Sequence, residues 1–339
     1  MKVLILGGTG VISRALTARL VSGGHEVVLF NRGTRSLAFE GRVRTIHGDR
    51  SRPGGLEKAL GDETFDAVID MICFNESDAE ETLRVFRGRA GHIVITSSVA
   101  AYKRPYRTLP TREDAEELHQ DPVFGYAFHK AELERHIRKA LERDRLPVTI
   151  IRPSLTYGAG AQNIGVLRQN YGIVDRIRKG KPLVMFGDGQ NPWQFTFVED
   201  LARAYEGILG KPRSFGQAYH ATSDELSRWE DLYLVLGRLV GVEPRILHLP
   251  SELLYKAAPN LCAHLYFEKT FPGIFDNGKL RTVAPDFRAH TSLRDGMAGI
   301  LAWWEKEAHA VDPEKDRLED RLAALHGDWA GKFSGLYPV

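Results

Sequence analysis

The sequence predicts an α/β protein with a doubly wound parallel sheet and a smaller C-terminal lobe. Three observations lead to this prediction. Strand-like apolar runs alternate with helix-length segments over residues 1–155, a glycine-rich turn directly follows the first run, and the alternation becomes irregular after Ile151. Regular alternation is typical of parallel strands that carry helices on both faces of one sheet.

The expected strands of the first domain are apolar on both faces, as strands are when helices cover both sides of a parallel sheet. Between the first two strands, apolar residues recur at helical spacing from Ile12 to Leu20, and Gly23-Gly24 ends this helix. The expected strands are Val3–Leu6, Glu26–Phe30, Val43–His47, Ala67–Met71, His92–Thr96 and Val148–Ile151.

Residues 156–310 are expected to form the smaller lobe, interleaved with the first domain and not joined to it by a clean linker. Residues 311–339 are expected to form a charged helix and an arm, to which the sequence assigns no role. Helical periodicity marks Val166–Lys179, Leu232–Val240 and Leu293–Lys306, and a strand pattern marks Pro244–Pro250.

Composition limits the classes of partner. The 46 basic and 44 acidic residues give a net charge of +2, which provides no global field for nucleic acid or anionic membrane. The two cysteines have no metal-ligand spacing and suit a reducing compartment, and the 12 histidines form no tight cluster. No apolar run reaches membrane-spanning length, and no cleavage pattern follows the N-terminus. We therefore expect a cytoplasmic protein without bound metal, nucleic acid or membrane.

The segment Gly7–Ser13, of sequence GGTGVIS, follows a buried strand and opens a helix. Turn glycines let the backbone approach a phosphate, and the first N–H groups of the helix supply donors and partial positive charge. This order of strand, turn and helix predicts a dinucleotide pyrophosphate site, with an ordinary ligand-free turn as the alternative. The residues expected to contact the cofactor here are Gly7, Thr9, Gly10, Val11 and Ile12.

Asn31 and Arg32 end the second strand, where the adenosine ribose of a dinucleotide arrives. An acidic residue there binds a ribose 2′-hydroxyl, whereas basic side chains accommodate a 2′-phosphate. Asn31, Arg32 and nearby Arg35 therefore favour NADP, with NAD as the alternative because Asn31 can also bond an unphosphorylated ribose. Asp49 can accept from the adenine amino group or serve as a turn residue, and we place the adjacent Arg50 in the same cofactor site.

Tyr126 and Lys130 are four residues apart, so on a helix they lie on one face. A phenol ordinarily titrates near ~10, and a neighbouring ammonium favours its ionised form. Tyr126 would therefore exchange the proton of a carbinol or carbonyl, while Lys130 would tune it and hold the nicotinamide ribose. Ser98, after the fifth expected strand, would hold the same substrate oxygen.

These features together resemble an extended short-chain dehydrogenase/reductase of the NAD-dependent epimerase/dehydratase group, over most of residues 1–300. The further landmarks are Ile151-Arg152-Pro153 before Tyr157-Gly158, then Gly187-Asp188-Gly189, then Phe197-Val198-Glu199-Asp200-Leu201-Ala202.

The resemblance implies a Rossmann-like first domain, a smaller substrate lobe and an active site in the cleft between them. It also implies that Met71, Ile72 and Pro153 line the cofactor together with Tyr126 and Lys130. Ser98 and Asn163 are then candidate substrate contacts, and a homodimer is expected.

Two departures from the family pattern concern the substrate. Dehydratases usually have an Asp-Glu pair just after the catalytic hydroxyl residue, whereas Val99-Ala100 follows Ser98 here. Many sugar-nucleotide enzymes have a diphosphate-binding arginine where this chain has Trp193, whose ring could stack on a sugar or simply belong to the core. The substrate is therefore hypothesised to be a glycoside, an aminoglycoside or another polyol.

The function expected first is an NAD(P)-dependent epimerase of a sugar or sugar-like polyol, which acts through a transient ketone. The alternative is an NADPH-dependent dehydrogenase or ketoreductase with net hydride transfer, which uses the same residues. A third reading is a dinucleotide sensor or nucleic-acid-binding protein, against which the set Ser98, Tyr126 and Lys130 argues.

Overall fold

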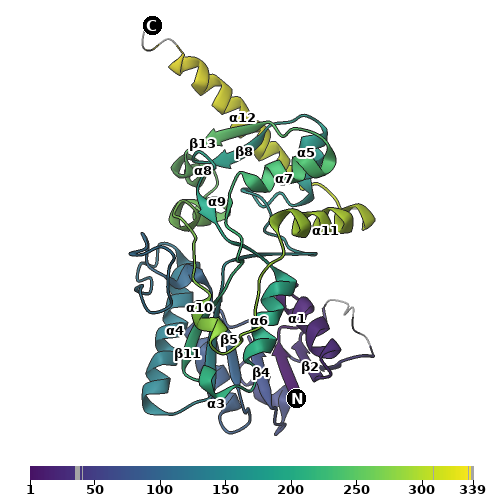
Figure 1. Ribbon diagram of the computed structural model, residues 1–339, viewed down its shortest axis with the longest axis vertical. Helices are drawn as coiled ribbons and strands as arrows, with labels where there is room; N and C mark the ends of the chain where they lie inside the picture. Colours follow the sequence, from purple (N-terminus) through teal and green to yellow (C-terminus); the bar gives the residue numbers. More distant parts are fainter. Residues whose placement is uncertain (35–38, 40, 308, 335, 337–339) are drawn as a thin grey trace. The chain divides into compact units, whose positions relative to one another are not determined.

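The computed structural model describes residues 1–34, 39, 41–307, 309–334 and 336 (Figure 1). The chain divides into two compact units. Unit 1 comprises residues 1–156, 196–224 and 274–290, and unit 2 comprises residues 157–195, 225–273 and 291–339.

Unit 1 is built on a seven-stranded sheet in the order β11-β6-β5-β4-β1-β2-β3, with all neighbours parallel. Sequence order runs outward in both directions from the boundary between β1 and β4, so the sheet is doubly wound and the predicted fold class is confirmed. The strands are β1 (Lys2–Leu6), β2 (Glu26–Asn31), β3 (Arg44–His47), β4 (Ala67–Asp70), β5 (Ile93–Thr96), β6 (Val148–Pro153) and β11 (Gln217–Ala221).

Alternate side chains of β1 enter two different cores, because successive residues of a strand point to opposite faces. Val3 and Ile5 pack under α1 (Val11–Ser22) and α6 (Val198–Ile208). On the other face, Leu4 and Leu6 belong to the core that includes residues of the remaining large helices of the unit. Those helices are α2 (Gly55–Leu60), α3 (Glu76–Phe86) and α4 (Gly125–Arg143).

Shorter elements complete unit 1 and its boundaries. Turns η1 (Val99–Ala101) and η2 (Pro212–Ser214) and helix α10 (Gly278–Arg281) belong to it. Strands β7 (Leu155–Tyr157) and β10 (Phe195–Phe197) pair where the chain passes from one unit's residues to the other's.

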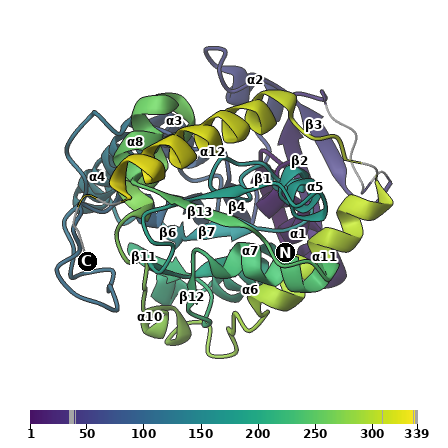
Figure 2. The same cartoon turned by 90° about the horizontal axis from the view of Figure 1, so that it is seen from above.

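Unit 2 contains two small sheets and several helices. The parallel pair is β8 (Leu183–Phe186) with β13 (Ile246–Leu249), and the antiparallel pair is β9 (Pro192–Trp193) with β12 (Ser227–Arg228). The helices are α5 (Tyr171–Arg178), α7 (Asp231–Val240), α8 (Ser251–Ala257), α9 (Pro259–His264), the π-helix η3 (Leu265–Lys269), α11 (Leu293–Lys306) and α12 (Pro313–Phe333). Helix α12 lies beside the β8–β13 pair in Figures 1 and 2.

One predicted helix of this unit begins later than expected. The periodicity from Val166 predicts a helix to Lys179, but α5 begins only at Tyr171. Arg168 and Asn170 have φ values of 53° and 54°, in the left-handed region that no α-helix uses. The segment before Tyr171 is instead a closed loop.

Among the described residues, no helix combines the length and apolar character needed to cross a bilayer. The same residues contain no group of three or more His, Cys, Asp or Glu side chains arranged to hold a metal ion.

Candidate functional site

The glycine turn stands at the carboxyl end of β1. Gly7 has φ of +102°, and its N–H donates to Phe30 O at 2.9 Å. A Cβ atom at Gly7 would lie 2.6 Å from Ile72 Cγ2, so only glycine fits between this turn and the segment after β4. Helix α1 begins at Val11 with Gly10 as N-cap, without a side-chain cap and without an acidic residue in its first turn. Its first N–H groups therefore suit an external anion.

Ser13 occupies the position of the third glycine in the common dinucleotide pattern. Its side chain is buried, its hydroxyl donates to Gly10 O at 3.1 Å, and Thr17 Oγ1 donates to Ser13 O at 2.7 Å. A serine is small enough for this close packing of helix on sheet, and it stabilises the turn.

Asn31 ends β2 and is only 8% exposed. Its Oδ1 accepts from Gly33 N at 2.8 Å, while its buried Nδ2 has no hydrogen-bond partner within the described parts of the chain. A buried donor without a partner is costly and indicates a missing acceptor. Arg32 beside it is exposed, and Arg35 lies outside the described residues.

Asp49 follows β3 and stays near the positive charge of Arg32. Its Oδ1 accepts from Ser51 N at 3.1 Å and from Ser51 Oγ at 2.8 Å. These bonds lower the pKa of Asp49, and the charges of Arg32 and Arg52 act in the same direction. The carboxylate is therefore held ionised in an accepting role.

The Arg50 side chain has a different role from the one expected for it. Its Nη1 donates to both oxygens of Asp70, at 3.0 and 2.8 Å, and its Nη2 donates to Asp78 O at 2.7 Å and Thr82 Oγ1 at 3.0 Å. The buried Asp70 also accepts from Ile72 N at 2.9 Å. Arg50 thus joins the end of β4 to α3 and stabilises the segment between them. Both of its Nη atoms already donate to protein acceptors.

Lys130 lies at the same edge of the sheet as the glycine turn. It is 3% exposed, and its Nζ donates to Cys73 O at 2.7 Å and to Thr96 O at 2.8 Å, beyond β4 and at the end of β5. Burial lowers the pKa of Lys130. Tyr126 stands one turn earlier on α4 and is 48% exposed, so its ring is accessible to a ligand.

Ser98 caps the short turn η1, since its Oγ accepts from Ala100 N at 3.1 Å. A hydroxyl that accepts in this way can still donate its own proton. Val99 and Ala101 of η1 share an apolar cluster with Ala131 of α4. This packing ties the turn that carries Ser98 to the helix that carries Tyr126 and Lys130.

Two further polar residues lie at this edge, Tyr205 and Thr96, and no local motif in the sequence marks either of them. Tyr205 of α6 shares a hydrogen bond of 2.8 Å with Thr96 Oγ1, and Thr96 Oγ1 lies 3.2 Å from Met71 Sδ. Burial raises the pKa of Tyr205, and the proximity of Tyr126 raises it further. Tyr205 lies among the apolar residues of an amphipathic helix. Its hydrogen bond to Thr96 at the end of β5 therefore becomes evident only from the fold.

A buried ion pair supports the serine turn and was not predicted from the sequence. Arg152 Nε donates to Glu134 Oε1 at 2.8 Å, and Ser97 Oγ donates to the same oxygen at 2.6 Å. All three side chains are buried. Pro153, expected to line the cofactor, is also buried and ends β6 directly after Arg152.

The two expected substrate residues outside unit 1 differ in accessibility. Trp193 is completely buried in unit 2, with its ring centroid 5.9 Å from that of Trp229 and with Lys269 Nζ 4.0 Å from its centroid. A covered ring cannot stack on a sugar, so the alternative of a core tryptophan is favoured. Asn163 is half-buried in the loop before α5.

The model of the NAD dependent epimerase/dehydratase family matches residues 3–221, from β1 through β11. The chain belongs to this family. It is therefore an enzyme of the extended short-chain dehydrogenase/reductase type, as the sequence motifs predicted.

Relatives in the family have different names and roles. The chain is 27% identical to 2′-dehydrokanamycin reductase of Streptomyces kanamyceticus, over 96% of this chain and 92% of that protein. It is also 27% identical to the chloroplast stem-loop binding protein of 41 kDa b of Arabidopsis thaliana, over 78% of this chain and 71% of that one.

Among solved structures, the UDP-glucuronic acid 4-epimerase of Bacillus cereus in complex with NAD aligns with a TM-score of 0.72. The alignment covers 90% of this chain and 97% of that chain, at 19% sequence identity. This structural likeness confirms the fold of the chain.

Proposed function

We propose that this enzyme interconverts a secondary hydroxyl and a ketone on a sugar-like polyol with NADP(H), and that net ketone reduction is its physiological direction. The observation that carries the proposal is the position of Lys130. Its ammonium lies at the carboxyl edge of β4 and β5, with the accessible Tyr126 one turn away on the same helix.

The residues present fit a dinucleotide. The uncapped start of α1 would hold the pyrophosphate through Gly7, Thr9, Gly10, Val11 and Ile12. Met71, Ile72 and Pro153 would line the nicotinamide side, and Asp49 with the main chain of Arg50 would meet the adenine. When bound, the cofactor supplies or accepts the hydride of the carbon that carries the reacting oxygen.

The residues at the end of β2 support NADP as the cofactor. Asn31 and Arg32 offer no carboxylate to a ribose 2′-hydroxyl, and the positive charge of the exposed Arg32 suits an anionic 2′-phosphate. The buried Asn31 Nδ2 is a donor that either a 2′-phosphate or a 2′-hydroxyl oxygen would satisfy. The charge of Arg32 therefore favours NADP, with NAD as the second choice.

Tyr126 would give a proton to the substrate oxygen in reduction and take it in oxidation. Two carbonyls occupy two of the three donors of Lys130, and the third is available for the nicotinamide ribose or for Tyr126. The Ser98 hydroxyl can donate to the same substrate oxygen and hold it beside Tyr126. The three side chains thereby supply general acid–base catalysis and orientation.

Net reduction is placed ahead of epimerisation, which reverses the order expected from the sequence. A relative that covers 96% of this chain is named 2′-dehydrokanamycin reductase, and NADPH is suited to reduction. The family name covers several activities, and the likeness to the solved UDP-glucuronic acid 4-epimerase, at 19% identity, concerns the fold alone.

The test is a net change in reduced nicotinamide absorbance. Purified enzyme is mixed with stoichiometric NADPH and with 2′-dehydrokanamycin, further keto-aminoglycosides or free keto-sugars. We expect loss of absorbance with at least one of these ketones. No net change with any of them, combined with tightly copurifying NAD and isomerisation of UDP-glucuronic acid, would establish the epimerase instead.

We propose a homodimer in the cytoplasm that binds no nucleic acid, although one relative is named a stem-loop binding protein. Light scattering measures the oligomer, and a gel-shift assay with a stem-loop RNA at physiological salt tests the absence of nucleic-acid binding.

A further inference from the structure

The loop Ile164–Asn170 in unit 2 is closed and strained. Its neck is fixed by two bonds, from Asn170 N to Ile164 O at 3.0 Å and from Ile164 N to Asn170 Oδ1 at 3.1 Å. Arg168 and Asn170 have positive φ, and Asn170 combines φ of 54° with ψ of −123°. Residues with side chains persist in such conformations only where their surroundings over-determine them.

Gln169 holds the inside of this loop. Its Oε1 accepts from Leu167 N at 3.0 Å, and its Nε2 donates to Tyr233 Oη at 3.3 Å and to Glu319 Oε1 at 3.0 Å. A Cβ atom at Gly165, which has φ of +90°, would collide with the Gln169 amide oxygen. The Gln169 side chain therefore fills the space inside the loop, and Glu319 of α12 helps to hold it there.

Helix α12 contacts the loop at Arg168 and at the neighbouring Gln169. Glu319 Oε1 also accepts from Val184 N of β8 at 2.7 Å, so one carboxylate joins the loop to a strand. Lys315 Nζ, one turn earlier on α12, donates to Arg168 O at 3.0 Å. Two side chains of the same helix thus hold Arg168 and the residue that follows it.

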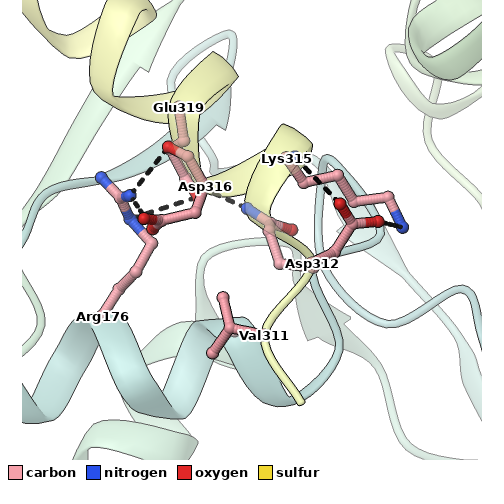
Figure 3. Close-up of a pocket in the computed structure, with 8 residues that line it drawn as sticks. Arg176, Val311, Asp312, Lys315, Asp316 and Glu319 are labelled. Atoms are coloured by element: carbon pink, nitrogen blue, oxygen red, sulfur yellow. Dashed lines mark hydrogen bonds and ion pairs between the residues drawn. The ribbon is translucent and has the colours of Figure 1, made fainter.

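Arg176 of α5 anchors α12 in this position. Its side chain is 1% exposed and is met by Asp316, by Glu319 at 3.3 Å and by Asp320 at 2.9 Å, which are three carboxylates on one face of α12. Nε and Nη2 of Arg176 also donate to Pro182 O at 2.9 and 2.7 Å. In Figure 3, Asp316 and Glu319 point from the helix toward Arg176, and these three side chains are among those that line a pocket there.

We propose that α12 is a latch that holds the loop Ile164–Asn170 in its strained form, with Glu319 and Lys315 as positioning residues. The loop neck directly follows Asn163, which the proposed function assigns to the substrate. The consequence for substrate therefore rests on that function, while the ordering of the loop does not. The C-terminal helix thereby has a role in shaping the substrate side of unit 2.

Hydrogen exchange of the full-length enzyme tests the latch. The variants are Glu319→Ala, Glu319→Gln and Lys315→Met, with Glu314→Gln and Arg317→Met as controls at exposed positions of the same helix. We expect amides of Ile164–Asn170 to exchange about tenfold faster in Glu319→Ala and Lys315→Met. Glu319→Gln retains an acceptor oxygen and should stay within about twofold of the wild type, as should the controls.

Two further measurements separate positioning from general damage. Exchange in the unit 1 sheet and the Kd for NADPH should remain unchanged in every variant. With a ketone that the wild type reduces, KM should rise about tenfold in Lys315→Met while kcat changes less than about twofold.

Unchanged loop exchange in Lys315→Met, or in a folded Glu319→Ala, would overturn the latch, and so would equal acceleration throughout both units. If Glu319→Ala does not fold, Lys315→Met decides. If the wild type reduces no ketone but the loop opens in the variants, the latch stands and the proposed function fails.

Discussion

Lys130 Nζ donates to the carbonyl oxygen of Thr96 at 2.8 Å, and this bond ties α4 to the carboxyl end of β5. The second bond, to Cys73 O at 2.7 Å, ties the same ammonium to the segment after β4. One side chain therefore fixes the helix that carries Tyr126 against the sheet edge where the glycine turn lies. The account of catalysis depends on this placement.

Lys130→Met removes the ammonium and with it the hydrogen bonds to Cys73 O and Thr96 O. We expect kcat/KM to fall by roughly 10²–10⁴ and the free energy of unfolding to fall by about 1–3 kcal/mol. Steady-state kinetics and urea denaturation measure both. Lys139→Met, at an exposed position of the same helix, is the control and should change neither. Full activity in Lys130→Met would remove this residue from the mechanism.

Asn31→Asp places a carboxylate at the end of β2. The charge would repel a 2′-phosphate and accept from a ribose 2′-hydroxyl, so the Kd ratio of NADP to NAD should rise by at least about tenfold. Isothermal titration with both cofactors measures the ratio. Arg32→Met should weaken the binding of NADP and leave the binding of NAD unchanged. An unchanged preference in both variants would mean that neither residue meets the cofactor.

Gly7→Ala tests the closeness of the turn to Ile72. The added Cβ would need φ of +102° and would lie 2.6 Å from Ile72 Cγ2. We expect a loss of about 2–4 kcal/mol in stability and weakened cofactor binding. Gly88→Ala also has positive φ but open space around the new Cβ, so it should cost only about 1–2 kcal/mol. Equal effects of the two substitutions would contradict the contact.

Burial raises the pKa of Glu319 to about 7 from an ordinary 4.5, although Arg176 acts in the opposite direction. Other groups around it are Asp316, Asp320, Lys181 and Tyr233. The folded state then binds a proton that the unfolded state releases, so this stabilisation is complete below about pH 4.5 and is lost as the pH rises to about 7.

Glu319→Gln cannot titrate, so its stability relative to the wild type should increase between about pH 4.5 and pH 7 and then remain level. The expected change is at most roughly 3 kcal/mol. Denaturation of both proteins at several pH values measures it, and a constant difference across this range would mean that Glu319 is ionised throughout.

The architecture of unit 1 could be predicted because its strands are apolar on both faces and its glycine turn has a local signature. Every predicted strand of this unit is present, with ends shifted by one or two residues. The start of α5 could not be predicted, because the left-handed Arg168 and Asn170 carry no strong local signal and depend on α12, far along the chain.

The candidate site was predictable where chemistry depends on local spacing. Tyr126 and Lys130 are four residues apart on one helix, and Ser98 lies two residues after the end of β5. The surroundings of Arg50 and Trp193 could not be predicted, because they come from segments distant in the sequence. Asp70 and Thr82 bind the Arg50 side chain. Trp229 and Lys269 pack against Trp193.

The most direct test of the central claim compares Tyr126→Phe with the wild type in a single turnover. Enzyme saturated with NADPH deuterated at the transferred position is mixed with the ketone that the wild type reduces. The account predicts deuterium at the carbinol carbon of the wild-type product, and a rate at least about 10²-fold lower in Tyr126→Phe with an unchanged Kd for NADPH. Equal transfer rates in the two proteins would contradict it.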